Sequence, residues 1–156
     1  MKANLDMRKN TLIVMCGIPA CGKSTFCQYL TANGMLCVSS DSIRKELYGD
    51  ESIQKAPNRV FKIAHNHIKE TGQKGLDCVF DATNLTARIR KNVVEEMRHY
   101  YDFILCYYFK PNLAESVKRN SARSRNVPVN VIEKMALSFE TPTTDEGFDY
   151  VCELKY

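Results

Sequence analysis

Short runs of apolar residues alternate along the chain with longer segments in which apolar residues recur every three or four positions. The short runs predict β-strands, and the longer segments predict amphipathic helices. Strands that alternate with helices are typical of an α/β domain with a parallel sheet. We therefore predict an open parallel sheet of about five strands flanked by helices, with strands at Thr11–Cys16, Met35–Ser39, Leu76–Asp81, Asp102–Phe109 and about Asp149–Leu154.

Capping residues indicate where several helices begin. Thr86 is a suitable N-cap for a helix whose apolar stripe is Ile89, Val93, Val94 and Met97. Asn112 and Asn130 each precede a glutamate by three residues, which is capping-box spacing. The last third of the chain is therefore predicted to be mainly helical until the final strand.

Composition and charge narrow the class of protein. The 156 residues predict one domain over 1–156, and 44% hydrophobic with 26% charged residues is typical of a globular core. A net charge of +4 tolerates a phosphate-rich partner without indicating one. Seven cysteines without a C-x-x-C pair fit neither a disulfide framework nor a zinc site, and no signal peptide or membrane span is evident. We expect a cytoplasmic protein with reduced thiols and no membrane partner.

Residues 17–24 carry the strongest chemical signal, because they match G-x-x-x-x-G-K-[ST] directly after a predicted strand. Glycines in such a loop let backbone N–H groups face phosphates. Lys23 would neutralise β- and γ-phosphate oxygens, and Ser24 would ligate Mg²⁺. ATP and Mg²⁺ are therefore the expected cofactors, against the alternative of a glycine-rich turn that binds no nucleotide.

Asp41 and Arg44 follow the second predicted strand, three residues apart and hence on one helix face. A carboxylate can orient and deprotonate a hydroxyl nucleophile, and a guanidinium can hold an anionic group of the acceptor. The alternative is that Asp41 is an N-cap and Arg44 a solvated helix residue.

Asp81 ends the third predicted strand, and Asn84 continues the turn after it. Beside a phosphate loop, Asp81 is suited to hold a water of Mg²⁺ or to bond the loop hydroxyl. Alternatively, both side chains satisfy backbone groups of the loop.

The dense basic run at 118–125 includes Arg119 and Arg123, whose spacing of four predicts a shared helix face. An arginine-bearing lid at about 115–130 would neutralise charge that develops during phosphoryl transfer and would exclude water. A solvated helix or a non-specific nucleic-acid patch is the alternative.

From Leu12 to Tyr150 the chain resembles the P-loop kinases, and specifically the phage-type and bacterial 5′-hydroxyl polynucleotide kinases. The motifs that carry the resemblance are G-I-P-A-C-G-K-S-T, D-S-I-R, D-A-T-N-L-T-A-R and K-R-N-S-A-R. It implies an adenylate-kinase-like P-loop NTPase fold with a helical lid. The implied ATP-binding residues are Gly17, Ile18, Pro19, Ala20, Cys21, Gly22, Lys23, Ser24, Thr25 and Arg123.

The same resemblance assigns roles on the acceptor side. Asp41 is the general base, Arg44 holds the acceptor phosphate, and Arg119 braces the site, for example through an ion pair with the third-strand acid. In the phage prototype that acid stands directly before Thr-Asn, whereas here Ala82 separates it from them. A D-x-D-x-T stretch of the fused phosphatase is missing from the sequence, so only kinase activity is carried over.

We therefore expect transfer of the γ-phosphoryl group of ATP, with Mg²⁺, to the 5′-hydroxyl end of DNA or RNA. A small-molecule P-loop kinase acting on a nucleoside, a sugar acid or an antibiotic is one alternative. A nucleotide-binding module without turnover is another. A GTPase is disfavoured because the sequence has no N-K-x-D stretch.

Overall fold

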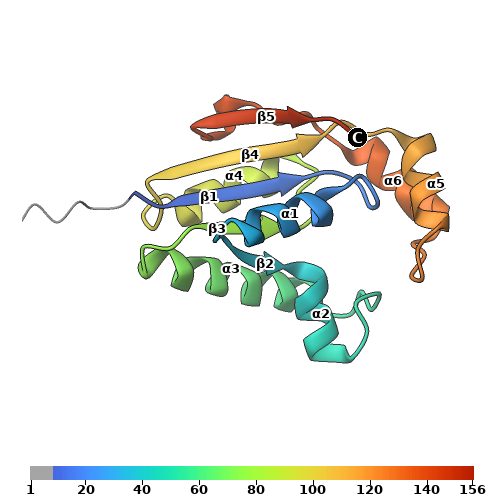
Figure 1. Cartoon of the computed structure of the whole chain (residues 1–156), viewed down its shortest axis with the longest axis horizontal. Coiled ribbons are helices and arrows are strands. Elements are labelled where there is room, and N and C mark those ends of the chain that lie inside the picture. Colours follow the sequence, from blue (N-terminus) through green and yellow to red (C-terminus); the bar gives the residue numbers. More distant parts are fainter. Residues whose placement is uncertain (1–8) are drawn as a thin grey trace, which may run out of the picture.

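Five parallel strands form one sheet in a computed structural model that describes residues 9–156. The strand order is β2-β3-β1-β4-β5 (Figure 1), which confirms the predicted open parallel sheet. The strands are β1 (Thr11–Cys16), β2 (Leu36–Ser39), β3 (Cys78–Asp81), β4 (Phe103–Phe109) and β5 (Tyr150–Leu154). Four of them begin one or two residues later than predicted, and before β2 and β3 the backbone still closes the end of the preceding helix. Leu76, for example, donates its N–H to the carbonyl of Thr71 at the end of the preceding helix.

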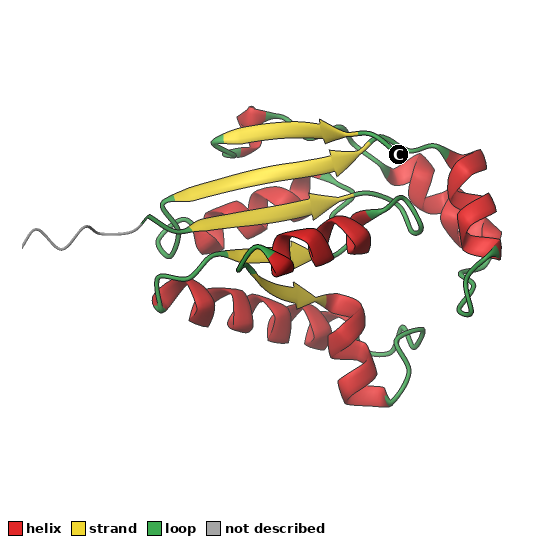
Figure 2. Cartoon of the chain, viewed as in Figure 1, coloured by secondary structure: helices red, strands yellow, loops and turns green. Residues whose placement is uncertain are grey.

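Helices cover both faces of the sheet (Figure 2). Residues of β1 alternate between the two faces: Leu12 and Val14 pack in one core with α3 and α4, and Ile13 and Met15 pack in another with α1 and α6. The helices are α1 (Lys23–Ala32), α2 (Ser40–Tyr48), α3 (Pro57–Gln73), α4 (Ala87–Met97), α5 (Leu113–Ser121) and α6 (Val129–Ser138), with a 3₁₀ turn η1 at Thr144–Glu146.

Two of the predicted caps are confirmed and one is wrong. Thr86 accepts a hydrogen bond from Ile89 N–H, and Asn112 accepts one from Glu115 N–H. Asn130 is not a cap, because α6 already begins at Val129 behind Pro128. Pro128 takes the N-cap position instead, and its carbonyl accepts the first hydrogen bonds of the helix from the N–H groups of Val131 and Ile132.

Arg90, and not the predicted Ile89, lies on the buried face of α4. The side chain of Ile89 is 45% exposed, whereas Arg90 is fully buried in line with Val93 and Val94. Arg90 donates from Nε and Nη2 to the two carboxylate oxygens of Glu146 in η1, at 2.7 Å each. Val93, Val94 and Met97 of the predicted stripe are buried, and only Ile89 was wrong, because a buried charge paired with a distant residue cannot be predicted from periodicity.

A helical hairpin of α5 and α6 stands at the carboxyl end of the sheet, and its connecting residues 122–128 hang toward the side where α2 lies (Figure 1). Asn120 fixes this connection, because its side chain exchanges two hydrogen bonds with the backbone of Val127, at 2.8 and 2.9 Å. The predicted lid segment thus consists of α5, this connection and the start of α6.

Among residues 9–156, none of the helices combines the length and the apolar character needed to cross a membrane.

Candidate active site

The P-loop links β1 to α1 at the carboxyl end of the central strand. Ala20 and Gly22 both have left-handed backbone angles, with φ of 60° and 112°, which turn the loop into the helix. Gly22 is the N-cap of α1 and supplies no side-chain cap. The amides of the first turn therefore remain available to an anion, and a phosphate at a helix N-terminus is stabilised by these donors.

Lys23 is buried and turned back into the loop. Its Nζ donates to the carbonyls of Gly17 at 2.8 Å and Ile18 at 2.9 Å. These bonds satisfy the ammonium group in the interior and hold its positive charge inside the curl of the loop. The loop and its lysine therefore fit a triphosphate.

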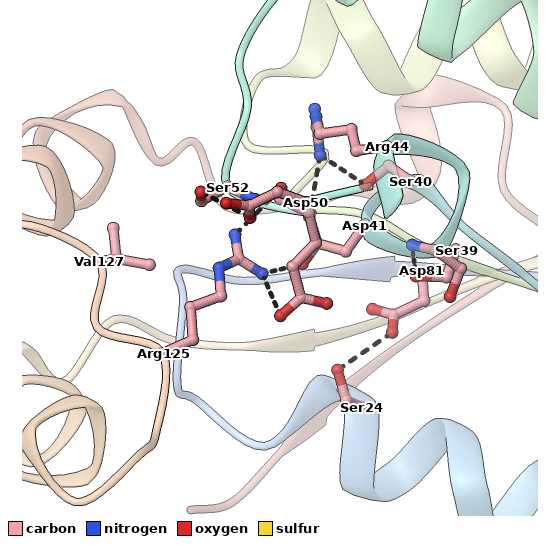
Figure 3. Close-up of polar contacts among 12 residues, drawn as sticks. Ser24, Ser39, Ser40, Asp41, Arg44, Asp50, Ser52, Asp81, Arg125 and Val127 are labelled. Carbon is pink, nitrogen blue, oxygen red and sulfur yellow. Dashed lines mark hydrogen bonds and ion pairs between the residues drawn. The ribbon is translucent and has the colours of Figure 1, made fainter. Parts of the chain in front are cut away.

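Asp81 lies next to the P-loop hydroxyl despite the intervening Ala82. Ser24 Oγ donates to Asp81 Oδ2 at 3.1 Å (Figure 3). Burial is the main cause that raises the pKa of Asp81, against the lowering effects of Lys23 and Ser24. A hydroxyl oxygen and a carboxylate oxygen are ligands that Mg²⁺ accepts, so the donor set at this edge fits that ion.

Asn84 serves the loop backbone, as the structural alternative predicted. It is buried with φ of 44°, and its Nδ2 donates to the carbonyl of Met15 at 2.8 Å. The backbone carbonyl of Asn84 accepts a hydrogen bond from Arg90 Nη1 at 2.9 Å. The backbone carbonyl of the preceding Thr83 accepts one from Gly17 N–H at 3.0 Å. The turn after β3 therefore ties the base of the P-loop to the buried Arg90.

Asp41 and Arg44 form a pair at the start of α2. The N-cap of α2 is Ser39, whose Oγ accepts from Ser42 N–H, so the alternative in which Asp41 is the cap is wrong. Arg44 is only 7% exposed, which also contradicts the solvated alternative. Its Nη1 lies 2.9 Å from Asp41 Oδ1 and 3.4 Å from Ser40 Oγ, and its buried Nε has no partner among the described residues. The Asp41 carboxylate remains half exposed.

Arg125 is a site residue that the sequence analysis did not single out. From the connection between α5 and α6 it reaches Asp41 Oδ2 at 3.4 Å (Figure 3). It also reaches Glu51 Oε1 at 2.9 Å. The helical spacing of Arg119 and Arg123 predicted that both lie on one helix face, but α5 ends at Ser121, so that spacing does not govern residue 123. Arg123 is exposed, and its side chain has no hydrogen bond or ion pair within the described part of the chain. The position of Arg125 beside Asp41 therefore could not be predicted from helical spacing.

Arg119 contacts the P-loop rather than the third-strand acid. Its Nε donates to Glu115 Oε1 at 2.8 Å, and its Nη1 donates to the carbonyl of Cys21 at 3.4 Å. Its guanidinium also lies over the ring of Tyr156, 5.1 Å from the ring centre. The expected ion pair with Asp81 is thus replaced by a brace between α5 and the phosphate loop.

All these groups gather beyond the carboxyl ends of β1, β2 and β3, where ligands bind in open parallel sheets. Their arrangement is that of a P-loop NTPase fold. A family model described as "AAA domain" matches residues 12–142. The chain belongs to the AAA domain family.

Three proteins illustrate how this AAA domain compares with known chains. The L-seryl-tRNA(Sec) kinase of Methanococcus maripaludis is 27% identical over 150 residues, which cover 88% of this chain and 56% of that kinase. A chain in the Pnkp1/Rnl/Hen1 RNA repair complex has a TM-score of 0.77 and 24% identity, over 94% of this chain and 48% of that one. A chain in another structure of the Pnkp1/Rnl/Hen1 complex has a TM-score of 0.66 and 26% identity, over 74% and 40%. The chain thus spans about half the length of these relatives.

Proposed function

We propose that this chain transfers the γ-phosphoryl group of ATP to the 5′-hydroxyl end of DNA or RNA. The observation that carries the proposal is the Asp41–Arg44 pair at 2.9 Å, set beside the loop that carries Lys23 and Ser24. One half of the site suits a triphosphate, and the other offers a carboxylate for a hydroxyl and a buried guanidinium for an anionic acceptor.

On the donor side, the P-loop amides and Lys23 bind the phosphates, and Ser24 and Asp81 would hold Mg²⁺. The ion would neutralise the negative charge that develops on the phosphate oxygens during transfer. Lys23 exchanges its bonds to the Gly17 and Ile18 carbonyls for phosphate oxygens. Arg123, which is exposed on the lid connection, reaches the same phosphates when the lid closes.

On the acceptor side, Asp41 aligns the hydroxyl and takes its proton, and Arg44 holds the neighbouring phosphate. Arg44 is suited to this role because Asp41 and Ser40 engage only Nη1 and leave Nε without a partner. A fork of parallel N–H donors matches two phosphate oxygens at once. Arg125 occupies Asp41 Oδ2 and Glu51, so an incoming hydroxyl displaces Arg125 from Asp41.

One relative supports a nucleic-acid acceptor. By its name, the 27% identical L-seryl-tRNA(Sec) kinase is a kinase that acts on a group carried by tRNA. The tRNA kinase favours a second candidate, in which the acceptor hydroxyl belongs to a seryl group carried on tRNA. An anionic backbone next to the hydroxyl is common to both acceptors, and Arg44 fits both.

The test is transfer of γ-labelled ATP to a panel of acceptors: 5′-OH DNA and RNA oligonucleotides, a 3′-mononucleotide, seryl-tRNA, free nucleosides and sugar acids. We expect label on an oligonucleotide, abolished by Asp41→Ala while ATP binding is retained. Asp50→Ala is the matched control, because Asp50 is a nearby acid whose side-chain hydrogen bonds go to Ser52.

Each outcome separates the candidates. Label on seryl-tRNA alone selects the second candidate, and label on a small alcohol alone contradicts a nucleic-acid acceptor. ATP binding without label on any acceptor supports a module without turnover. Substantial turnover by Asp41→Ala contradicts the assignment of Asp41 as the base.

A further inference from the structure

Two cysteines and an aspartate from three different elements meet beneath the start of α1. Cys27 lies one turn after Ser24 in α1, Cys37 lies in β2, and Asp81 ends β3. The two sulfur atoms and a carboxylate oxygen of Asp81 all lie within 4.8 Å of one another. The three groups form a cluster that the proposed phosphoryl transfer uses only through Asp81.

The pairing of β2 with β3 explains why these side chains meet. Ser39 lies opposite Asp81 and Cys37 lies opposite Val79, in a parallel register. Alternation along the strands therefore places Cys37, Val79 and Asp81 on one face of the sheet. Val79 packs in the same core as Cys27, so this is the face that α1 covers.

The ligand atoms suit a thiophilic cation in tetrahedral geometry. Bonds of about 2.3 Å from Zn²⁺ to sulfur place two thiolates about 3.8 Å apart, with a carboxylate oxygen at a similar separation. All three atoms already lie within 4.8 Å, so small side-chain rotations suffice to reach this geometry. Three protein ligands leave the fourth position to a water molecule.

Access and proton balance also allow binding. Cys27 is only 3% exposed, but Cys37 is an exposed residue of the edge strand and opens the cluster to solvent. When the ion binds, two metal–sulfur bonds and one metal–oxygen bond form, and thiol protons leave to solvent. The cluster has no C-x-x-C signature in the sequence, because its ligands come from separate elements.

Asp81 couples the cluster to the P-loop, because its Oδ2 also accepts the hydrogen bond from Ser24 Oγ at 3.1 Å. We propose that Cys27, Cys37 and Asp81 form a binding site for a thiophilic divalent cation such as Zn²⁺, and that the bound ion opposes Mg·ATP binding. The first part stands on the cluster alone. The second part rests on the proposed function, because it requires Ser24 and Asp81 to hold Mg²⁺. By linkage, bound Mg·ATP lowers the affinity of the chain for the thiophilic cation by the same factor.

The first experiment titrates Co²⁺ into the full chain, reduced with a phosphine and free of nucleotide. We expect one Co²⁺ per chain, with the visible bands of a tetrahedral ion and thiolate charge-transfer bands that Zn²⁺ removes. Cys37→Ser should weaken Co²⁺ binding by at least about tenfold, because even partners of metal ligands contribute about 10–100-fold. Cys152→Ser is the matched control, because Cys152 is a partly exposed thiol on β5, outside the cluster. Missing thiolate bands, or equal affinities in the wild type and Cys37→Ser, would overturn the site.

The second experiment measures the affinity for Mg·ATP calorimetrically, with and without one equivalent of Zn²⁺. We expect Zn²⁺ to weaken Mg·ATP binding to the wild type and to leave Cys37→Ser unaffected. Equal affinities of the wild type in both conditions overturn the coupling. A chain that binds no ATP at all contradicts the proposed function instead, and the Co²⁺ spectrum still decides the metal site.

Discussion

The buried Arg90–Glu146 pair provides the sharpest test of how this fold is stabilised. Arg90 is fully buried and the side chain of Glu146 is 4% exposed, so neither charge is solvated by water. Removing one partner of such a pair leaves the other charge uncompensated, at a cost of about 3–5 kcal/mol. The free energy of unfolding of a domain is typically about 5–15 kcal/mol, so Arg90→Met removes a large fraction of the stability.

We expect Arg90→Met to lower the thermal midpoint by about 6–20 °C, at roughly 2–4 °C for each kcal/mol in a domain of this size. Arg98→Met is the matched control. Arg98 pairs with Asp149 at 2.8 Å, but these side chains are 37% and 41% exposed. An exposed pair contributes about 0–1 kcal/mol, so the control should lose only a few degrees.

The measurement is thermal and urea unfolding followed by circular dichroism, for both variants and for Arg90→Met combined with Glu146→Leu. The double variant removes both charges and should recover part of the loss. The reasoning is refuted if Arg90→Met is no less stable than Arg98→Met. It is also refuted if the double variant is less stable than Arg90→Met alone.

Two further predictions concern the site. Burial raises the pKa of the Asp81 carboxyl above its ordinary 3.8, so the folded state binds the carboxyl proton more tightly than the unfolded state does. This tighter proton binding stabilises the folded state at low pH, and the stabilisation is lost as the pH rises through the raised pKa. Asp81→Asn should therefore have a higher thermal midpoint than the wild type at neutral pH, and this advantage should vanish below pH 3.8; an equal or lower midpoint at neutral pH would contradict it. Arg125 joins the lid connection to Glu51 and Asp41, so Arg125→Gln should speed amide hydrogen exchange in residues 122–128 by about two- to fivefold, whereas the exposed Arg123→Gln should not. Equal exchange in both variants would show that Arg125 does not hold the connection.

The strands and most helices could be predicted because their burial depends on local periodicity. Leu12 to Cys16 of β1 are buried on both faces of the sheet, and this run is correspondingly apolar throughout. The P-loop could be predicted for a related reason, since its glycines and lysine act within a few residues of one another. Features that depend on one segment were therefore accessible to a pattern.

Features that depend on contacts between two distant segments could not be predicted from the sequence pattern. Arg90 is buried because Glu146 comes to it, and a basic residue in an amphipathic helix is ordinarily solvated. Arg125 reaches Asp41 only because the chain leaves the helical path after Ser121. In each case the partner that decides the position lies more than fifty residues away in the sequence.

The strand order has a consequence for how the phosphate loop comes into being during synthesis. Leu12 in the central strand pairs with Cys78 on one side and Ile104 on the other, so β1 emerges from the ribosome long before its neighbours. At about 5–20 residues per second, several seconds separate β1 from the strands that hold it. The loop between β1 and α1 is therefore made well before the strands that flank β1, and it becomes ordered only after they have formed. During that interval the apolar β1 is an exposed segment that a chaperone can bind, and contacts of such long range are expected to make folding slow.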